Sequence, residues 1–93
     1  MTKVVIIDAD GKICARVIGP TGAEHRRLAN TVMEEALGEA NLSFGEISCV
    51  IATGYGRLNV PFADRQITEL TCHARGVVSL FPTVRIAIDI GGQ

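Results

Sequence analysis

Residues 3–18 constrain the fold of this 93-residue chain most strongly, because they form two strand patterns joined by a turn. A β-branched run leads into residues 8–11 (Asp-Ala-Asp-Gly), where Gly11 can adopt the positive φ that a tight hairpin needs. In residues 12–18 apolar and polar side chains alternate, which predicts a return strand with one buried and one solvated face. We therefore expect the chain to begin with an antiparallel β-hairpin.

A helix is expected after this hairpin. Gly19-Pro20 breaks the strand, and Thr21 and Glu24 have the spacing of a capping box at a helix N-terminus. The apolar residues that follow recur at helical spacing, as on a helix that lies against a sheet. They are Leu28, Val32, Met33, Ala36, Leu37 and Ala40.

The second half of the chain has the pattern of a βαβ unit. Residues 47–53 are nearly continuous in apolar side chains and predict a buried strand. A second helix is predicted to begin near Ala63 or Asp64 and to be stopped by Pro82. Residues 84–90 then predict a last buried strand. Hairpin, helix, strand, helix and strand together indicate the α/β class, with a right-handed crossover between the last two strands.

Composition excludes several classes of protein. The hydrophobic fraction of 47% is too high for a disordered segment, and no apolar stretch approaches the roughly 20 residues that a membrane-spanning helix needs. A formal net charge of -1 provides no excess of positive charge that would attract nucleic acid or anionic lipid. We expect neither nucleic acid nor membrane as a partner.

The cysteines indicate a reducing compartment. Cys14, Cys49 and Cys72 are odd in number and contain no CxxC pair, which argues against a disulfide framework and favours the cytoplasm. We expect them to be small core hydrophobes. Cys72 and His73 are adjacent on the predicted helix and point too far apart to grip one metal ion. Glu69 and His73, at i and i+4, are expected to share a hydrogen bond instead.

Glycines follow two of the predicted strands and mark a candidate phosphate site. One group is Thr53-Gly54-Tyr55-Gly56-Arg57, and the other is residues 89–93 (Asp-Ile-Gly-Gly-Gln). If the two strands are parallel neighbours, both groups emerge at one sheet edge, where glycine N–H groups can approach phosphate oxygens. Asp89 would then hold Mg²⁺ through water or orient an attacking water. Each group alone is more often an ordinary turn, and it is the coincidence of the two that favours phosphate binding. Neither group is a phosphate loop of the GxxxxGK[ST] type or a GxGxxG fingerprint.

Four motifs in order give the chain a family resemblance. They are residues 52–57 (Ala-Thr-Gly-Tyr-Gly-Arg), 62–64 (Phe-Ala-Asp), 67–74 (Ile-Thr-Glu-Leu-Thr-Cys-His-Ala) and 88–93 (Ile-Asp-Ile-Gly-Gly-Gln). Together they resemble the activator ATPases of 2-hydroxyacyl-CoA dehydratases and the related ATPase subunits of ATP-dependent benzoyl-CoA reductases. The resemblance covers essentially the whole chain.

This resemblance implies the actin/Hsp70/sugar-kinase fold, in which two ribonuclease-H-like domains close over ATP and Mg²⁺. Such proteins are homodimers or pairs of related subunits bridged by one [4Fe-4S] cluster, and ATP hydrolysis drives an electron into the dehydratase or reductase. By the same resemblance, Asp89 serves Mg²⁺ or water, and Gly91 and Gly92 contact phosphate. Four further residues are assigned to the cofactor-binding cleft: Thr53, Gly54, Gly56 and Arg57.

The chain also departs from the family pattern. The family's first strand, with an Asp-x-Gly-Ser-Thr phosphate motif, has no match here, and the cluster cysteines lie downstream of residues 89–93. The resemblance therefore implies a fragment: residues 1–83 as a partial first ribonuclease-H-like domain, and 84–93 as the opening strand and phosphate motif of the second. We expect residues 84–90 to fill the place of the absent strand, between 2–8 and 47–53, in a four-stranded sheet.

Such a fragment is expected to be inactive alone, with neither a complete ATP site nor the ligands of the cluster. Two other interpretations remain open from the sequence. One is a non-catalytic truncated α/β module, and the other is a different ATPase or kinase of the same fold superfamily.

Overall fold

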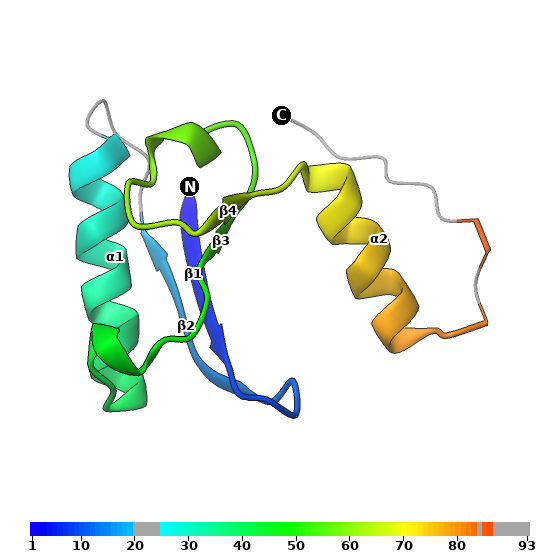
Figure 1. Ribbon diagram of the computed structural model, residues 1–93, viewed down its shortest axis with the longest axis horizontal. Coiled ribbons are helices and arrows are strands. Elements are labelled where there is room, and N and C mark those ends of the chain that lie inside the picture. Colours follow the sequence, from blue (N-terminus) through cyan, green and yellow to red (C-terminus); the bar gives the residue numbers. More distant parts are fainter. Residues whose placement is uncertain (20–24, 84, 87–93) are drawn as a thin grey trace.

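The computed structural model describes residues 1–19, 25–83 and 85–86 of the chain. Two hairpin strands come first, a long helix follows, and short elements lead to a second helix (Figure 1). In chain order the elements are β1 (Thr2–Ile7), β2 (Ile13–Gly19), α1 (His25–Ala40), the 3-10 helix η1 (Phe44–Glu46), β3 (Ile51–Ala52), the 3-10 helix η2 (Arg57–Asn59), β4 (Arg65–Gln66) and α2 (Glu69–Leu80).

The predicted N-terminal hairpin is confirmed. β1 and β2 pair antiparallel, with Ile6 opposite Ala15, and the register shifts between Ile6 and Ile7. The turn is organised by the Asp8 carboxylate, which accepts hydrogen bonds from the N–H groups of Asp10 and Lys12, both at 2.9 Å. Gly11 adopts a φ of 81°, as the turn chemistry predicts. Local residues alone therefore specify this hairpin.

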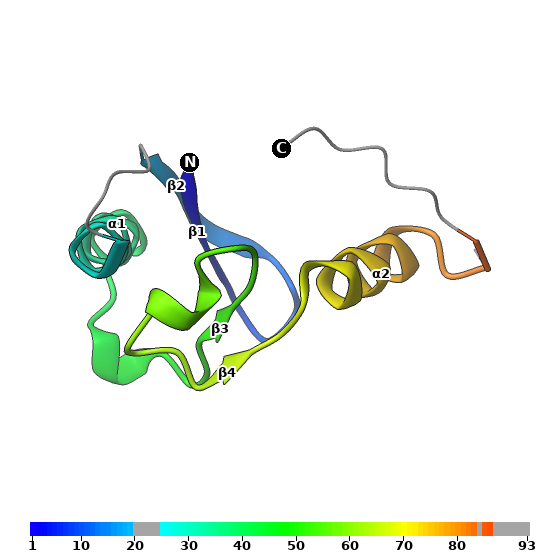
Figure 2. The same ribbon diagram turned by 90° about the horizontal axis from the view of Figure 1, so that it is seen from above.

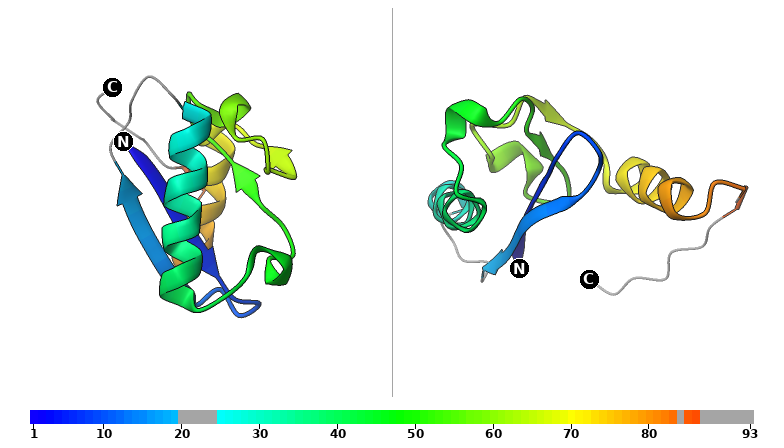
Figure 3. Two further views of the ribbon diagram at one scale, coloured as in Figure 1. Left: turned by 90° about the vertical axis from the view of Figure 1, so that its left-hand side faces the viewer. Right: turned by 90° about the horizontal axis from the view of Figure 1, so that it is seen from below.

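α1 supplies most of the hydrophobic core. It lies across one face of β1 and β2 (Figure 3), and its predicted apolar residues Val32, Met33, Ala36 and Leu37 are buried. Met33, Ala36 and Leu37 pack with Ile6 and Ala15 from the strands in one cluster. The predicted capping residues Thr21 and Glu24 lie outside the described residues. The periodic pattern thus identified the core face of this helix correctly.

The C-terminus of α1 is closed by the left-handed residue Asn41, whose φ is 57°. The N–H of Leu42 donates to the Leu37 carbonyl at 2.9 Å, and the N–H of Asn41 donates to the Gly38 carbonyl at 3.2 Å. These two bonds form a Schellman motif, which satisfies carbonyls that the helix end leaves open. The chain can therefore turn sharply from α1 into η1.

The predicted strand over residues 47–53 exists only in part. Two residues, Ile51 and Ala52, form β3, and they pair in parallel with Arg65 and Gln66 of β4. β4 was not predicted, since its polar sequence carries no strand pattern. The N–H of Ile67 also donates to the Ala52 carbonyl at 3.0 Å, which extends the connection.

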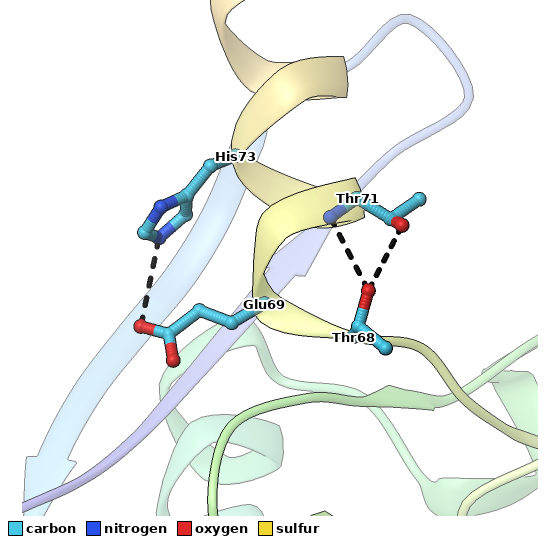
Figure 4. A network of polar contacts seen from close by, with 4 residues as sticks. All are labelled: Thr68, Glu69, Thr71 and His73. Carbon is cyan, nitrogen blue, oxygen red and sulfur yellow. Dashed lines mark hydrogen bonds and ion pairs between the residues drawn. The ribbon is translucent and has the colours of Figure 1, made fainter. Parts of the chain in front are cut away.

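The second helix begins later than predicted. The start near Ala63 or Asp64 is wrong, because the chain there is bound to the β3 segment and the helix begins at Glu69. Thr68 provides the N-cap: its hydroxyl accepts from the Thr71 N–H at 3.4 Å and lies 2.9 Å from the Thr71 hydroxyl (Figure 4). The helix ends at Leu80, before Pro82, as expected.

The described strands form two separate two-stranded sheets, β1–β2 and β3–β4. Seen from above, α1 covers one side of the hairpin, and α2 stands on the other side, apart from it (Figure 2). Of the predicted strand 84–90, only Arg85 and Ile86 are described, and both lie outside any strand. The rest of that segment lies outside the described residues, so the four-stranded sheet and the division at residue 84 stay predictions.

Candidate functional site

The candidate site is the glycine turn that leaves the carboxyl end of β3. Thr53 follows the strand directly, Gly54, Gly56 and Arg57 are half-buried, and Tyr55 at the tip is fully exposed. The site residues predicted at Asp89, Gly91 and Gly92 lie outside the described residues. The structure therefore gives the geometry of one of the two predicted glycine groups.

The turn is held closed by Arg57. Its Nη1 donates to the Gly54 carbonyl at 3.0 Å, and its backbone N–H donates to the same oxygen at 3.3 Å. Gly54 has a φ of 88°, a backbone conformation that favours glycine over other residues. Arg57 thus positions the turn through a side-chain contact that the sequence did not predict.

The turn leaves backbone donors available. Within the described part of the chain, the N–H groups of Tyr55 and Gly56 make no hydrogen bond, while those of Arg57 and Asn59 bond to carbonyls inside the turn. Two successive N–H groups in a glycine turn form a concave anion-binding arrangement, and Arg57 adds a positive charge beside it. A phosphate contact at this turn stays a prediction.

Asp64 positions the strand that leads into the site, a role that the sequence did not predict. Its carboxylate accepts from the Val50 N–H at 2.6 Å, and its own N–H donates to the Val50 carbonyl at 2.8 Å. The two bonds hold the residue that precedes β3. The signal for this role in the sequence is that Asp64 stands between the apolar pair Phe62-Ala63 and the polar pair Arg65-Gln66.

The cysteines do not behave as predicted. The expectation that they are core hydrophobes is wrong: Cys14 and Cys49 are exposed, and Cys72 is only half-buried. Cys14 lies on the hairpin strand β2, whose second face has no helix over it. Among the described residues, no three His, Cys, Asp or Glu side chains gather in a way that could hold a metal ion.

Glu69 and His73 lie side by side on α2 (Figure 4). The His73 Nε2 is 3.8 Å from the Glu69 Oε1, which is an ion-pair distance when the imidazole is protonated but too long for the expected hydrogen bond. Both side chains are about half exposed. The pair is a surface contact of one helix turn and adds no ligand site.

Among the helices in the described part of the chain, none is long and apolar enough to cross a membrane.

Comparisons with known proteins identify relatives of the chain. The sequence model of the BadF/BadG/BcrA/BcrD ATPase family matches residues 1–93. A 2-hydroxyisocaproyl-CoA dehydratase activator from Clostridioides difficile is 52% identical over 62 residues, covering 67% of this chain and 23% of the relative. An activator of lactoyl-CoA dehydratase from Anaerotignum propionicum is 43% identical over 95 residues, covering 99% of this chain and 35% of the relative.

A solved structure agrees with these sequence relatives. It is the activator of the 2-hydroxyisocaproyl-CoA dehydratase from Clostridium difficile with bound ADPNP, which superposes with a TM-score of 0.73 at 39% identity. The match covers 89% of this chain and 31% of that one, so the chain spans about a third of its length. This similarity confirms the predicted fold class, an α/β part of the actin-like ATPase fold.

Proposed function

This chain belongs to the BadF/BadG/BcrA/BcrD ATPase family, and from that premise we propose that it forms part of an ATP-hydrolysing activator of a 2-hydroxyacyl-CoA dehydratase. The observation that carries this proposal is the agreement among its relatives, since two of them in sequence and one in structure are dehydratase activators. A benzoyl-CoA reductase as the enzyme served belongs to the same proposal, on the resemblance alone. Because the chain spans about a third of those relatives, the activity is proposed for the whole protein.

The nucleotide is proposed to be ATP. A relative with bound ADPNP supports this choice, and the turn after β3 supports a role for Thr53, Gly54, Gly56 and Arg57 beside the phosphates. In that role the N–H groups of Tyr55 and Gly56 would donate to phosphate oxygens, and Arg57 would hold the turn in shape. The second phosphate contact is assigned to Gly91 and Gly92, with Asp89 for Mg²⁺ or the attacking water.

The electron-transfer part of the proposal lies outside the described residues. A [4Fe-4S] cluster would supply one-electron chemistry, and the family resemblance places its cysteine ligands downstream of residues 89–93. We assign its ligands to the length of the relatives that this chain does not span, and we route no step through it here. The partners proposed are the dehydratase or reductase component and a second activator subunit, identical or related. The cytoplasm is the proposed compartment, in keeping with three free cysteines.

A chimera tests the proposal directly. The chain replaces the segment of the Anaerotignum propionicum lactoyl-CoA dehydratase activator that it matches, and ATPase activity and dehydratase activation are measured anaerobically. We expect both activities to be retained. In the chimera, Arg57→Ala is expected to weaken ATP binding by about tenfold or more, because it removes a charge and loosens the turn. Arg65→Ala, an exposed arginine on β4, serves as the matched control.

The outcomes separate the parts of the proposal. A folded chimera that binds ATP without activating the dehydratase would overturn the proposed partner and leave the nucleotide site standing. Equal ATP affinity in the Arg57→Ala and Arg65→Ala chimeras would overturn the assignment of Arg57. For the 93-residue chain alone, calorimetric titration with ATP and Mg²⁺ is expected to show no micromolar binding.

A further inference from the structure

A contact between two phenylalanines links η1 to the segment that follows the glycine turn. The ring centroids of Phe44, on η1, and Phe62, after η2, lie 5.9 Å apart, and the ring planes are tilted by 47°. At this separation aromatic rings attract each other beyond what the area they bury provides. Phe62 also packs against the hydrophobic core cluster. The chain that leaves the glycine turn is therefore tied both to η1 and to the core.

The glycine turn lies in a loop that is closed at its base. We call residues 51–63 the site loop: it begins with β3, includes the turn and η2, and ends beside Asp64. The N–H groups of Asp64 and Arg65 both donate to the Val50 carbonyl, at 2.8 and 3.3 Å, and the Asp64 carboxylate accepts from the Val50 N–H at 2.6 Å. Compact loops with adjacent ends frequently carry functional residues. These bonds fix the two ends of the site loop but not the residues between them.

Beyond β3, the hydrogen bonds inside the site loop are short-range. The N–H groups of Arg57 and Asn59 donate to carbonyls three residues earlier, and the Ala63 N–H donates to the Val60 carbonyl at 3.2 Å. Such bonds shape single turns and do not fix the loop relative to the rest of the chain. The ring of Phe62 provides a long-range contact of that kind, since its partner lies on a different element.

η1 gives Phe62 a partner that is itself held in place. The Glu46 carboxylate accepts from the N–H and the hydroxyl of Ser43, at 3.1 and 3.2 Å, and the Glu46 N–H donates to the Ser43 carbonyl at 3.0 Å. This is a capping box around a single turn. The Schellman motif at the end of α1 sets the direction in which the chain enters η1. η1 and η2 both lie on the α1 side of the hairpin (Figure 2).

We propose that Phe44 and Phe62 are positioning residues of the glycine turn, which hold it in the shape that presents the N–H groups of Tyr55 and Gly56 to a phosphate. A loop fixed only at its ends loses backbone entropy whenever its middle adopts one conformation. The ring contact offsets this cost before the ligand arrives, which is pre-organisation. The rings act through the chain that joins Phe62 to Arg57. The phosphate in this inference rests on the proposed function, whereas the hold on the turn rests on the contacts alone.

Amide hydrogen exchange on the full chain tests the hold without any nucleotide. The reporters are the N–H groups of Arg57 and Asn59, which are bonded inside the site loop. Phe44→Ala is expected to speed their exchange by about three- to tenfold, which is the contribution of an aromatic pair. Amides of β1 and β2 should keep their rates, because the opening is local. Phe44 is 47% exposed, so its loss leaves the core intact.

Two further variants separate the ring contact from general packing. Phe62→Leu keeps an apolar side chain against the core and removes the second ring, so it should speed exchange at Arg57 and Asn59 as much as Phe44→Ala does. Phe44→Tyr keeps the ring and should restore the exchange rates of the parent. In the double variant of Phe44→Ala and Phe62→Leu, the second change should add little, because the contact is already lost.

Phe81→Ala is the matched control. Phe81, the third phenylalanine of the chain, is the C-cap of α2 and is 60% exposed. Its loss should leave the exchange of Arg57 and Asn59 unchanged. Equal exchange at these two amides in Phe44→Ala and Phe81→Ala would overturn the proposal. Faster exchange shared equally by β1 and β2 would also overturn it, since the ring would then stabilise the whole fold and not the turn.

The chimera with the lactoyl-CoA dehydratase activator supplies the functional measurement. There Phe44→Ala is expected to raise the dissociation constant of ATP by about three- to tenfold, and Phe44→Tyr should restore it. Faster exchange at Arg57 together with unchanged ATP affinity would overturn the positioning role. A chimera that binds no ATP would instead overturn the proposed function, while the exchange rates would still decide whether the two rings hold the turn.

Discussion

Asp64 and Val50 exchange two hydrogen bonds: the Asp64 carboxylate accepts from the Val50 N–H at 2.6 Å, and the Asp64 N–H donates to the Val50 carbonyl at 2.8 Å. One side chain thereby fixes the residue that leads into β3 and, through β3, the glycine turn. This relationship joins residues 14 apart in sequence. It explains why residues 64–66 lie beside β3 and do not join α2.

Replacing Asp64 should therefore weaken the whole β3–β4 region. Asp64→Ala is expected to lower the free energy of unfolding by about 1–2 kcal/mol, since it removes a charge-assisted hydrogen bond to a backbone N–H. Asp64→Asn keeps an acceptor oxygen and should lose about half as much. Urea unfolding followed by circular dichroism measures both. Glu34→Gln, a charge removed from an exposed position on α1, is the control, and an equal loss in it would contradict the role of Asp64.

Gly19 is expected to tolerate no side chain. A Cβ at this position would lie 2.7 Å from the Cγ2 of Val32, which is only 2% exposed and cannot move aside. Gly19→Ala should destabilise the fold by about 1–3 kcal/mol, as overpacking does in a tight core. A double-mutant cycle with Val32→Ala checks the cause, because the second substitution removes the clashing methyl group. Additive losses in the cycle would show that the clash is not the source.

Gly38 gives the opposite prediction on the same helix. Nothing lies within 4 Å of a Cβ built there, and Gly38 lies inside α1 near its C-terminal end. Gly38→Ala should stabilise the chain by about 0.5–1 kcal/mol, since glycine is a poor helix former and loses more backbone entropy on folding. Thermal unfolding should show a raised midpoint, and a lowered one would mean that the Schellman turn at Asn41 depends on Gly38.

The sequence predicted the hairpin and α1 because their signals are local. Gly11 and the Asp8 carboxylate form the turn within a few residues, and the i, i+4 row on α1 marks its buried side. β4 and the late start of α2 were not predictable in this way. Their positions depend on the hydrogen bond between Asp64 and Val50 and on the N-cap at Thr68. The spacing of apolar residues along a helix carries no information about either contact.

The candidate site was likewise predicted only as far as local sequence order determines it. A glycine turn after β3 follows from sequence order, but the contact of Arg57 with the Gly54 carbonyl depends on how the side chain folds back. The exposure of Cys14 was missed because burial depends on which faces other elements cover. An alternating strand shows two faces, and only the tertiary structure shows that α1 covers one of them.

Gly54 gives the last prediction, and it separates backbone strain from crowding. Its φ is 88°, and no atom lies within 4 Å of a Cβ built on it, so an added methyl group meets open space. Gly54→Ala should nevertheless destabilise the turn by about 1–2 kcal/mol, because an L residue is strained at that φ. Gly54→Asn should lose less, since asparagine tolerates left-handed backbone better.

The matched control is Gly76→Ala on α2, where the Cβ also meets nothing and the backbone is helical. That change should raise helix content, as alanine is the better helix former. Urea unfolding and amide hydrogen exchange of residues 54–59 measure the difference. Unchanged exchange in Gly54→Ala would mean that the turn accepts another conformation, and Arg57 could then not be holding the Gly54 carbonyl in place.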